Sequence, residues 1–203
     1  MEQTPTTKAQ SLWFDELNSF EEHFRQTYAD NAEETDGNRV HRIRKDVEAE
    51  DIIDEMLDLY LLGYAYGIQD TNESMETDEH PTAEQAEQSI YYRVDGKTFE
   101  DRVRDHIKTD APVEDFIRII ETEGMRNFCS GGYDTAVKAG ANWKIWRAVM
   151  DEKTRDTHFY LNGIKVAIDA DFYSASGASA PEPRKFGVGE EDCNCRCTLR
   201  YEK

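Results

Sequence analysis

The chain has 203 residues and a formal net charge of −19, from 43 acidic and 24 basic side chains. Its apolar runs fall short of a membrane span, and four cysteines are too few for a disulfide framework in a chain of this length. Residues 1–90 carry 23 acidic against 6 basic side chains, whereas residues 91–203 carry 20 against 18. The acidic first part disfavours contact with nucleic-acid phosphates, and the cysteine usage favours the reducing cytoplasm.

The first 90 residues are predicted to be helical. Apolar side chains recur at three- and four-residue steps from Trp13 to Tyr28, and a second apolar stripe runs through 47–69. Gly63 and Gly67 are four apart on the second helix and would let another backbone approach closely. The simplest interpretation of both stripes is ordinary core, and the alternative is a docking surface for a partner protein.

The later elements predict an α+β fold, with helices first and a small antiparallel sheet last. The acidic stretch 71–87 is expected to be a loop or linker that leads into a short helix. Beyond it we expect helices at 99–106 and 112–130, with 133–139 continuing as helix until Gly140. We then expect strands at 143–150 and 164–168, an irregular loop at 174–189 and a terminal strand that starts at Cys193. We divide the chain into an acidic helical region, 1–90, and a small α+β domain, 91–203, whose sheet is closed by the Cys-rich C-terminal strand.

Three of the four cysteines, Cys193, Cys195 and Cys197, occupy alternate positions near the end of the sequence. In an extended strand, residues two apart face the same side, so the three thiols would form one row. Two or three thiolates and a His from another segment could hold a tetrahedral Zn²⁺, although Cys-x-Cys is a less usual spacing than Cys-x₂₋₄-Cys. The alternatives are small buried side chains in a terminal strand, or a disulfide between Cys129 and Cys193.

The second unusual motif is Asp-x-x-Thr-Arg-x-x-His, which starts at Asp151. In a helical turn Thr154 and His158 would share a face, and Asp151 could cap that turn. In a functional interpretation, His158 is a metal ligand or an acid–base group, and Arg155 clamps an anion. In a structural interpretation, Arg155 pairs with Asp151 or Glu152, and the motif fixes a corner of the fold.

The two motifs are expected to meet in space. The Asn-Gly turn signal after the His motif would bring the chain back as a hairpin. The terminal strand is the later element that can cover this hairpin, which would place Cys195 and Cys197 beside His158. If Zn²⁺ binds there, Cys193 or Asp151 would complete four ligands. If none binds, His158 would bond to a backbone carbonyl or to Asp151.

From residue 92 to its end, the sequence resembles the phage Mu F-like family of minor head proteins, also called head morphogenesis proteins. The resemblance rests on an entry segment at 94–103, a Thr-Glu helix at 120–126, a Lys-x-Trp strand at 144–146, a central box at 150–163 and Asn-Cys-Arg-Cys at 194–197. The residues that match the family motif are Asp151, Thr154, Arg155, His158, Gly163, Asn194 and Arg196.

This resemblance implies a structural protein of the virion. Such a protein would associate with the portal and with capsid or scaffold proteins while the head assembles in the host cytoplasm, without any membrane contact. It could also accompany the DNA and touch it weakly. The resemblance assigns no catalytic residue, so we predict no catalytic turnover. We also predict that the helices of residues 1–90 are needed for incorporation into procapsids.

Two other functions fit the same residues. Glu123, Arg155 and His158 supply the acid, base and anion clamp that a nuclease-like hydrolase requires. A zinc-stabilised interaction module with no role in a phage would use the cysteines in the same way as a head protein. The geometry of these residues distinguishes the first of these functions from the others.

Overall fold

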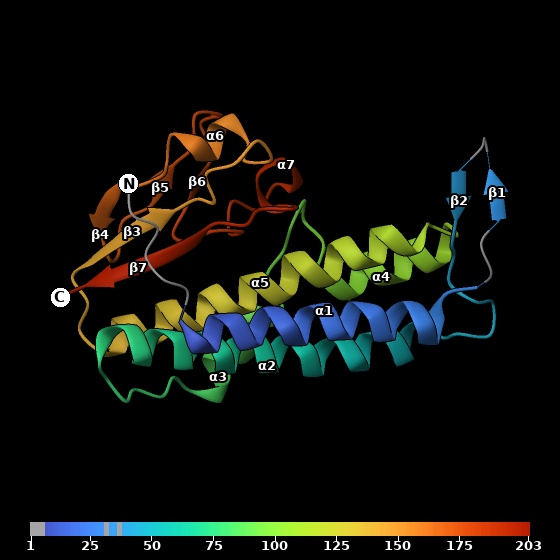
Figure 1. Ribbon diagram of the computed structural model, residues 1–203, viewed down its shortest axis with the longest axis horizontal. Helices are drawn as coiled ribbons and strands as arrows, with labels where there is room; N and C mark the ends of the chain where they lie inside the picture. Colours follow the sequence, from blue (N-terminus) through green and yellow to red (C-terminus); the bar gives the residue numbers. More distant parts are fainter. Residues whose placement is uncertain (1–6, 31–32, 36–37) are drawn as a thin grey trace.

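The computed structural model describes residues 7–30, 33–35 and 38–203, and it combines a helical layer with a small sheet packed at one end of it (Figure 1). The longer helices are α1 (Lys8–Tyr28), α2 (Ala49–Met75), α3 (Ala83–Ile90), α4 (Phe99–Lys108) and α5 (Val113–Lys138). Helices α1, α2 and α5 lie side by side along the molecule (Figure 1). No helix among the described residues is long and apolar enough to cross a membrane.

The sheet that positions the candidate site has three antiparallel strands. They are β3 (Trp143–Arg147), β4 (Lys165–Ala167) and β7 (Thr198–Glu202), in the order β4-β3-β7. Two short helices, α6 (Asp156–Phe159) and α7 (Gly189–Asp192), and a two-stranded ladder of β5 (Phe172–Tyr173) with β6 (Ser179–Ala180) complete this part. A separate hairpin of β1 (Glu33–Thr35) and β2 (Asn38–Val40) follows α1. The fold is therefore α+β, with helices first and antiparallel strands last, as the sequence predicts.

Helix α2 is longer than its apolar stripe. It was expected to end near residue 69, but it continues to Met75, where Glu76 adopts a left-handed conformation and ends it. Thr71 lies within this extension and is 1% exposed because it packs against α5. The expected loop at 71–87 is therefore helix at both ends, since tertiary packing outweighs the polar composition of the segment.

Helices α2 and α5 approach each other through glycines. A Cβ atom at Gly67 would lie 1.9 Å from the carbonyl oxygen of Phe128, and one at Gly131 would lie 2.1 Å from the carbonyl oxygen of Tyr64. The predicted close approach at Gly67 is confirmed. The helix that was expected to continue until Gly140 runs unbroken as α5 to Lys138, and its glycines admit the α2 backbone.

The aromatic stripe of α1 forms core. Trp13 and Phe24 are fully buried, and their hydrophobic cluster also contains Phe99 and Phe116 from the second half of the chain. The simpler of the two interpretations of this stripe is therefore correct. Because one cluster draws on both sides of position 90, the division of the chain at that position describes its charge and not a separation of cores.

Candidate metal centre

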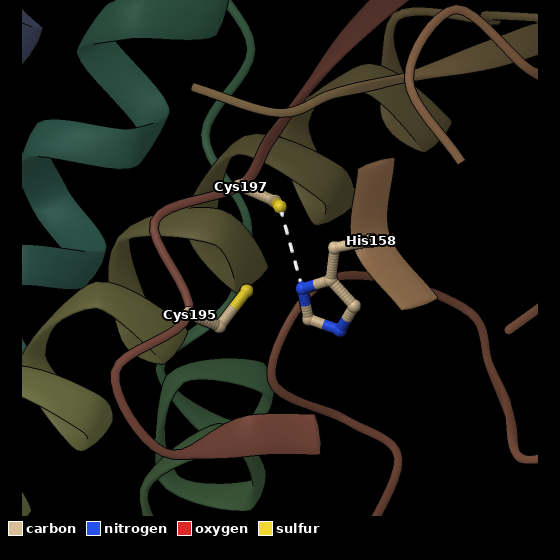
Figure 2. A group of neighbouring side chains, drawn as sticks. All are labelled: His158, Cys195 and Cys197. Atoms are coloured by element: carbon tan, nitrogen blue, oxygen red, sulfur yellow. Dashed lines mark hydrogen bonds between the residues drawn. The ribbon is translucent and has the colours of Figure 1, made fainter. Parts of the chain in front are cut away.

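The structure brings the two sequence motifs together. His158 comes from α6, and Cys195 and Cys197 come from the segment that leads into β7; all three side chains point toward one another (Figure 2). The Sγ of Cys197 lies 3.6 Å from Nδ1 of His158, and the candidate ligand atoms of the three residues all lie within 4.8 Å of one another. The predicted meeting of His158 with the two cysteines is confirmed.

These separations suit a small tetrahedral metal ion. With Zn–S bonds of about 2.3 Å and Zn–N bonds of about 2.0 Å, ligand atoms across a tetrahedron are about 3.5 to 3.8 Å apart. The 3.6 Å contact already has this length, and the widest separation of 4.8 Å closes with a shift of about 1 Å. One imidazole and two thiols are also the donor types that Zn²⁺ takes at structural sites. The buried group can therefore hold a metal ion.

Cys193 is not part of this group. The predicted strand from Cys193 to Cys197 is wrong, because β7 starts only at Thr198 and the cysteines precede it in an irregular segment. Asn194 has a φ of 55°, and this left-handed residue turns the chain between Cys193 and Cys195. The Sγ of Cys193 therefore lies beside Gly189 and not beside the other two sulfurs. All four cysteines are free thiols, so the expected alternative of a Cys129–Cys193 disulfide is not formed.

The other ring nitrogen of His158 faces a buried carboxylate. Nε2 lies 2.9 Å from Oε2 of Glu191, which is 4% exposed. Glu191 also accepts hydrogen bonds from the hydroxyls of Thr157, Ser174 and Ser176. Burial alone would raise the pKa of Glu191, but these hydroxyls and the nearby imidazole lower it below the usual value. The contact lacks hydrogen-bond geometry and is a close electrostatic approach. A carboxylate beside Nε2 favours a proton on that nitrogen, which would leave the Nδ1 lone pair directed at the sulfurs. The predicted alternative partners of His158, a carbonyl or Asp151, are therefore replaced by Glu191.

The remaining motif residues tie the two segments together. Asp151 forms a bidentate pair with Arg196, with contacts of 2.5 and 2.8 Å. Arg155 donates to the carbonyl oxygens of Glu191 and Cys193, at 2.5 and 2.6 Å. The expected pairing of Arg155 with Asp151 or Glu152 is therefore wrong, and so is the expected capping of the helix by Asp151, since Arg155 occupies the N-cap of α6. Asp151 and Arg155 thus make structural contacts with partners other than those expected, and His158 of the same box remains a candidate ligand.

The pKa values of Cys195 and Cys197 are shifted in opposite directions. Burial raises the pKa of Cys195, but a hydrogen bond with Cys197, the charge of Arg184 and the contact with His158 outweigh burial and lower it well below its usual value. The pKa of Cys197 is raised by its contact with Cys195 and by burial. Arg184 is fully buried and donates to the carbonyl oxygens of Cys195 and Cys197. One thiolate is thus favoured before a metal binds, and binding would displace the second proton.

Glu123 lies in a different cluster. It is fully buried, and its carboxylate accepts from Arg126, which is also fully buried, and from Arg102. The structure therefore does not gather Glu123 with Arg155 and His158 in one cleft. Sequence reasoning missed Glu191 and Arg184, because one sits in the acidic run 190–192 and the other in a Pro-bearing loop, and neither context signals burial.

The motifs thus lie in a small α+β domain that contains a buried His-Cys-Cys group and an Asp–Arg pair between its two motif segments. Residues 83–200 match the family described as Phage Mu protein F like protein. The chain therefore belongs to the phage Mu protein F-like family.

Two curated proteins are similar over part of the chain. One, named NAD(+)--arginine ADP-ribosyltransferase EFV, is from Enterococcus faecalis and is 42% identical over 95 residues, which cover 45% of this chain and 19% of that protein. The other, named Minor head protein GP7, is from Bacillus phage SPP1 and is 35% identical over 83 residues, which cover 39% of this chain and 27% of that protein. The matches thus span about a fifth to a quarter of these relatives' lengths. No solved structure matches the chain.

Proposed function

We propose that this chain is a minor head protein that associates with the portal and procapsid during virion assembly and enters the virion. Membership of the phage Mu protein F-like family over 83–200 carries the proposal, and the similarity to a protein named as a minor head protein supports it. The similarity to the ADP-ribosyltransferase covers only 19% of that protein, so we do not carry its activity over to this chain.

The exposed face of α2 is the surface we assign to the portal. Leu61 and Leu62 are 47% and 40% exposed there. Leu61 borders a hollow of about 400 Å³, and Leu62 borders another of about 410 Å³. Asp58 lines both hollows. Asp54 and Glu55 add acidic groups, one to each hollow. Apolar side chains rimmed by carboxylates fit an amphipathic segment with Lys or Arg at its edges, so we propose a basic amphipathic segment of the portal as the occupant.

Procapsid assembly tests this assignment. The chain is co-expressed with the portal, scaffold and major capsid proteins of the same phage, and its amount in purified procapsids is measured. The double variant Leu61→Ser/Leu62→Ser should lose most of its incorporation. The variant Val137→Ser removes a side chain that is 47% exposed on α5, and it should incorporate like wild type. Equal incorporation of both variants would contradict the assignment.

We also propose that contact with DNA is weak. The net charge of −19 repels phosphates, and the 18 basic side chains of residues 91–203 are offset by 20 acidic ones. DNA should therefore bind weakly and lose binding as salt rises. A tight complex at physiological salt would contradict this expectation.

The metal we propose for His158, Cys195 and Cys197 is Zn²⁺, since one imidazole and two thiols match its preferred donors. Protein purified without chelator should contain about one equivalent of zinc, and chelation should lower its Tm. The variant Cys197→Ser should lose the metal, whereas Cys129→Ser, which changes a buried thiol outside the group, should keep it. Zinc-free protein from a zinc-replete culture would contradict the proposal.

A nuclease remains the alternative function. Its three expected residues are divided between two places, because Glu123 is fully buried with Arg126 while His158 faces the cysteines. We therefore expect no cleavage of single- or double-stranded DNA or RNA, with or without divalent metals. Cleavage that disappears in His158→Ala would favour the nuclease instead.

A further inference from the structure

The candidate metal centre offers three side-chain ligands, whereas tetrahedral zinc takes four. The group of His158, Cys195 and Cys197 includes no fourth His, Cys, Asp or Glu from the described residues. Two acidic side chains of the same segments are held elsewhere. Asp151 is bound in its bidentate pair with Arg196, and Glu191 contacts the opposite nitrogen of the imidazole.

A small hollow lies directly against the three ligands. His158, Cys195 and Cys197 form part of its wall, and its volume is about 10 Å³. That is the room needed by about one water molecule. A further side chain does not fit into such a space, but a water or one end of a small ion does.

The charge around this hollow favours a negative ligand. Lys153, Arg155 and Arg196 line it, and no Asp or Glu is among the described residues that do so. Arg196 is neutralised by Asp151, whereas Arg155 donates to backbone carbonyl oxygens, which carry no net charge. A hydroxide or a small anion at the hollow would therefore be attracted by the wall as well as by the metal.

We propose that the fourth ligand of this centre is exchangeable and comes from solvent: a water or hydroxide that a small inorganic anion can replace. This inference rests on the proposed zinc site. Three protein ligands with one open position are the arrangement that zinc sites use when a ligand must exchange, and four protein ligands close the site. The competing arrangement uses Cys193 as the fourth ligand after the turn at Asn194 unwinds.

Cobalt substitution separates the two arrangements, because Co²⁺ in place of Zn²⁺ gives an absorption band from each thiolate bond. The full chain is loaded with Co²⁺ and compared with Cys193→Ser and Cys195→Ser. Two thiolate ligands predict that Cys193→Ser keeps the full band and that Cys195→Ser keeps about half of it. A loss of about one third in Cys193→Ser means three thiolates, and it would overturn the proposal.

Azide titration then probes the open position. Azide should shift the visible cobalt bands of the wild-type protein, and in Lys153→Gln it should bind up to about fivefold more weakly, the range of an exposed ion pair. Bands that stay unchanged at saturating azide would overturn the exchangeable ligand while leaving the metal site intact. Failure of the wild-type protein to bind Co²⁺ or Zn²⁺ at all would instead overturn the zinc proposal, and with it this one.

Discussion

Glu191 offers the sharpest test of how the candidate metal centre is held. Its carboxylate lies 2.9 Å from Nε2 of His158 and is 4% exposed. In Glu191→Gln the side chain keeps its shape, and its amide can still bond the hydroxyls of Ser174 and Ser176, which can both donate and accept. The change therefore removes the charge that faces Nε2 and leaves the packing in place.

The expected loss of zinc affinity is about 10- to 100-fold, the usual effect of removing a carboxylate behind a ligating imidazole. This corresponds to about 1.4 to 2.7 kcal/mol. Competition with a chromophoric chelator at neutral pH measures the affinity, and thermal melting in excess chelator checks that the metal-free fold is unchanged.

Glu190→Gln is the matched control, because Glu190 is its neighbour on α7 and is exposed. It should bind zinc like wild type. If Glu191→Gln also binds zinc within about twofold of wild type, Glu191 does not orient the imidazole, and the assignment of Nδ1 as the ligand atom loses its support.

Three further outcomes follow from the helical layer. Gly131→Val should destabilise the fold by about 1 to 3 kcal/mol or prevent folding, because its Cβ would meet the Tyr64 carbonyl oxygen at 2.1 Å; chemical denaturation measures this. Arg126→Met should cost about 3 to 5 kcal/mol by leaving the buried Glu123 carboxylate with Arg102 as its remaining partner, whereas Arg118→Met on the surface should cost at most about 1 kcal/mol. Burial and, to a smaller extent, the charge of Glu121 raise the pKa of Glu21 to about 7 in the folded state. Between about pH 4.5 and 7 the folded state therefore holds a proton that the unfolded state has lost, so stability falls as the pH rises through this range. Glu21→Gln should therefore raise the Tm at pH 7 and have little effect at pH 4.5, and a gain that is equal at both pH values would refute this reasoning.

The first helix could be predicted from sequence because it buries one apolar face. The stripe from Trp13 to Tyr28 repeats at helical spacing, and that spacing alone identifies α1. The end of α2 could not be predicted in the same way, because its last turns are polar and Thr71 is buried there against Gly132 of α5. That contact depends on another helix, and no local pattern in the sequence contains it.

The candidate site likewise has residues that the sequence predicts and residues that it does not. His158, Cys195 and Cys197 could be grouped from sequence, because their residue types are rare and share a metal chemistry. The exclusion of Cys193 depends on one left-handed residue, Asn194, and alternate spacing cannot reveal it. The role of Glu191 could not be predicted, because a carboxylate in an acidic run is expected to be exposed. Its burial depends on three hydroxyl groups from other segments, which donate hydrogen bonds to it.

The separation of His158 from Cys197 by 39 positions has a consequence for biosynthesis. At about 5 to 20 residues per second, the ribosome adds Cys197 about 2 to 8 seconds after His158. During that interval α1, α2 and α5 already have their complete apolar faces, while β3 still lacks β7 and the imidazole lacks both sulfurs. The metal centre can therefore close only after the helical layer has had time to form. A nascent chain stopped before Cys195 would carry a finished helical core and an open sheet, and zinc uptake would mark the chains that have passed this point.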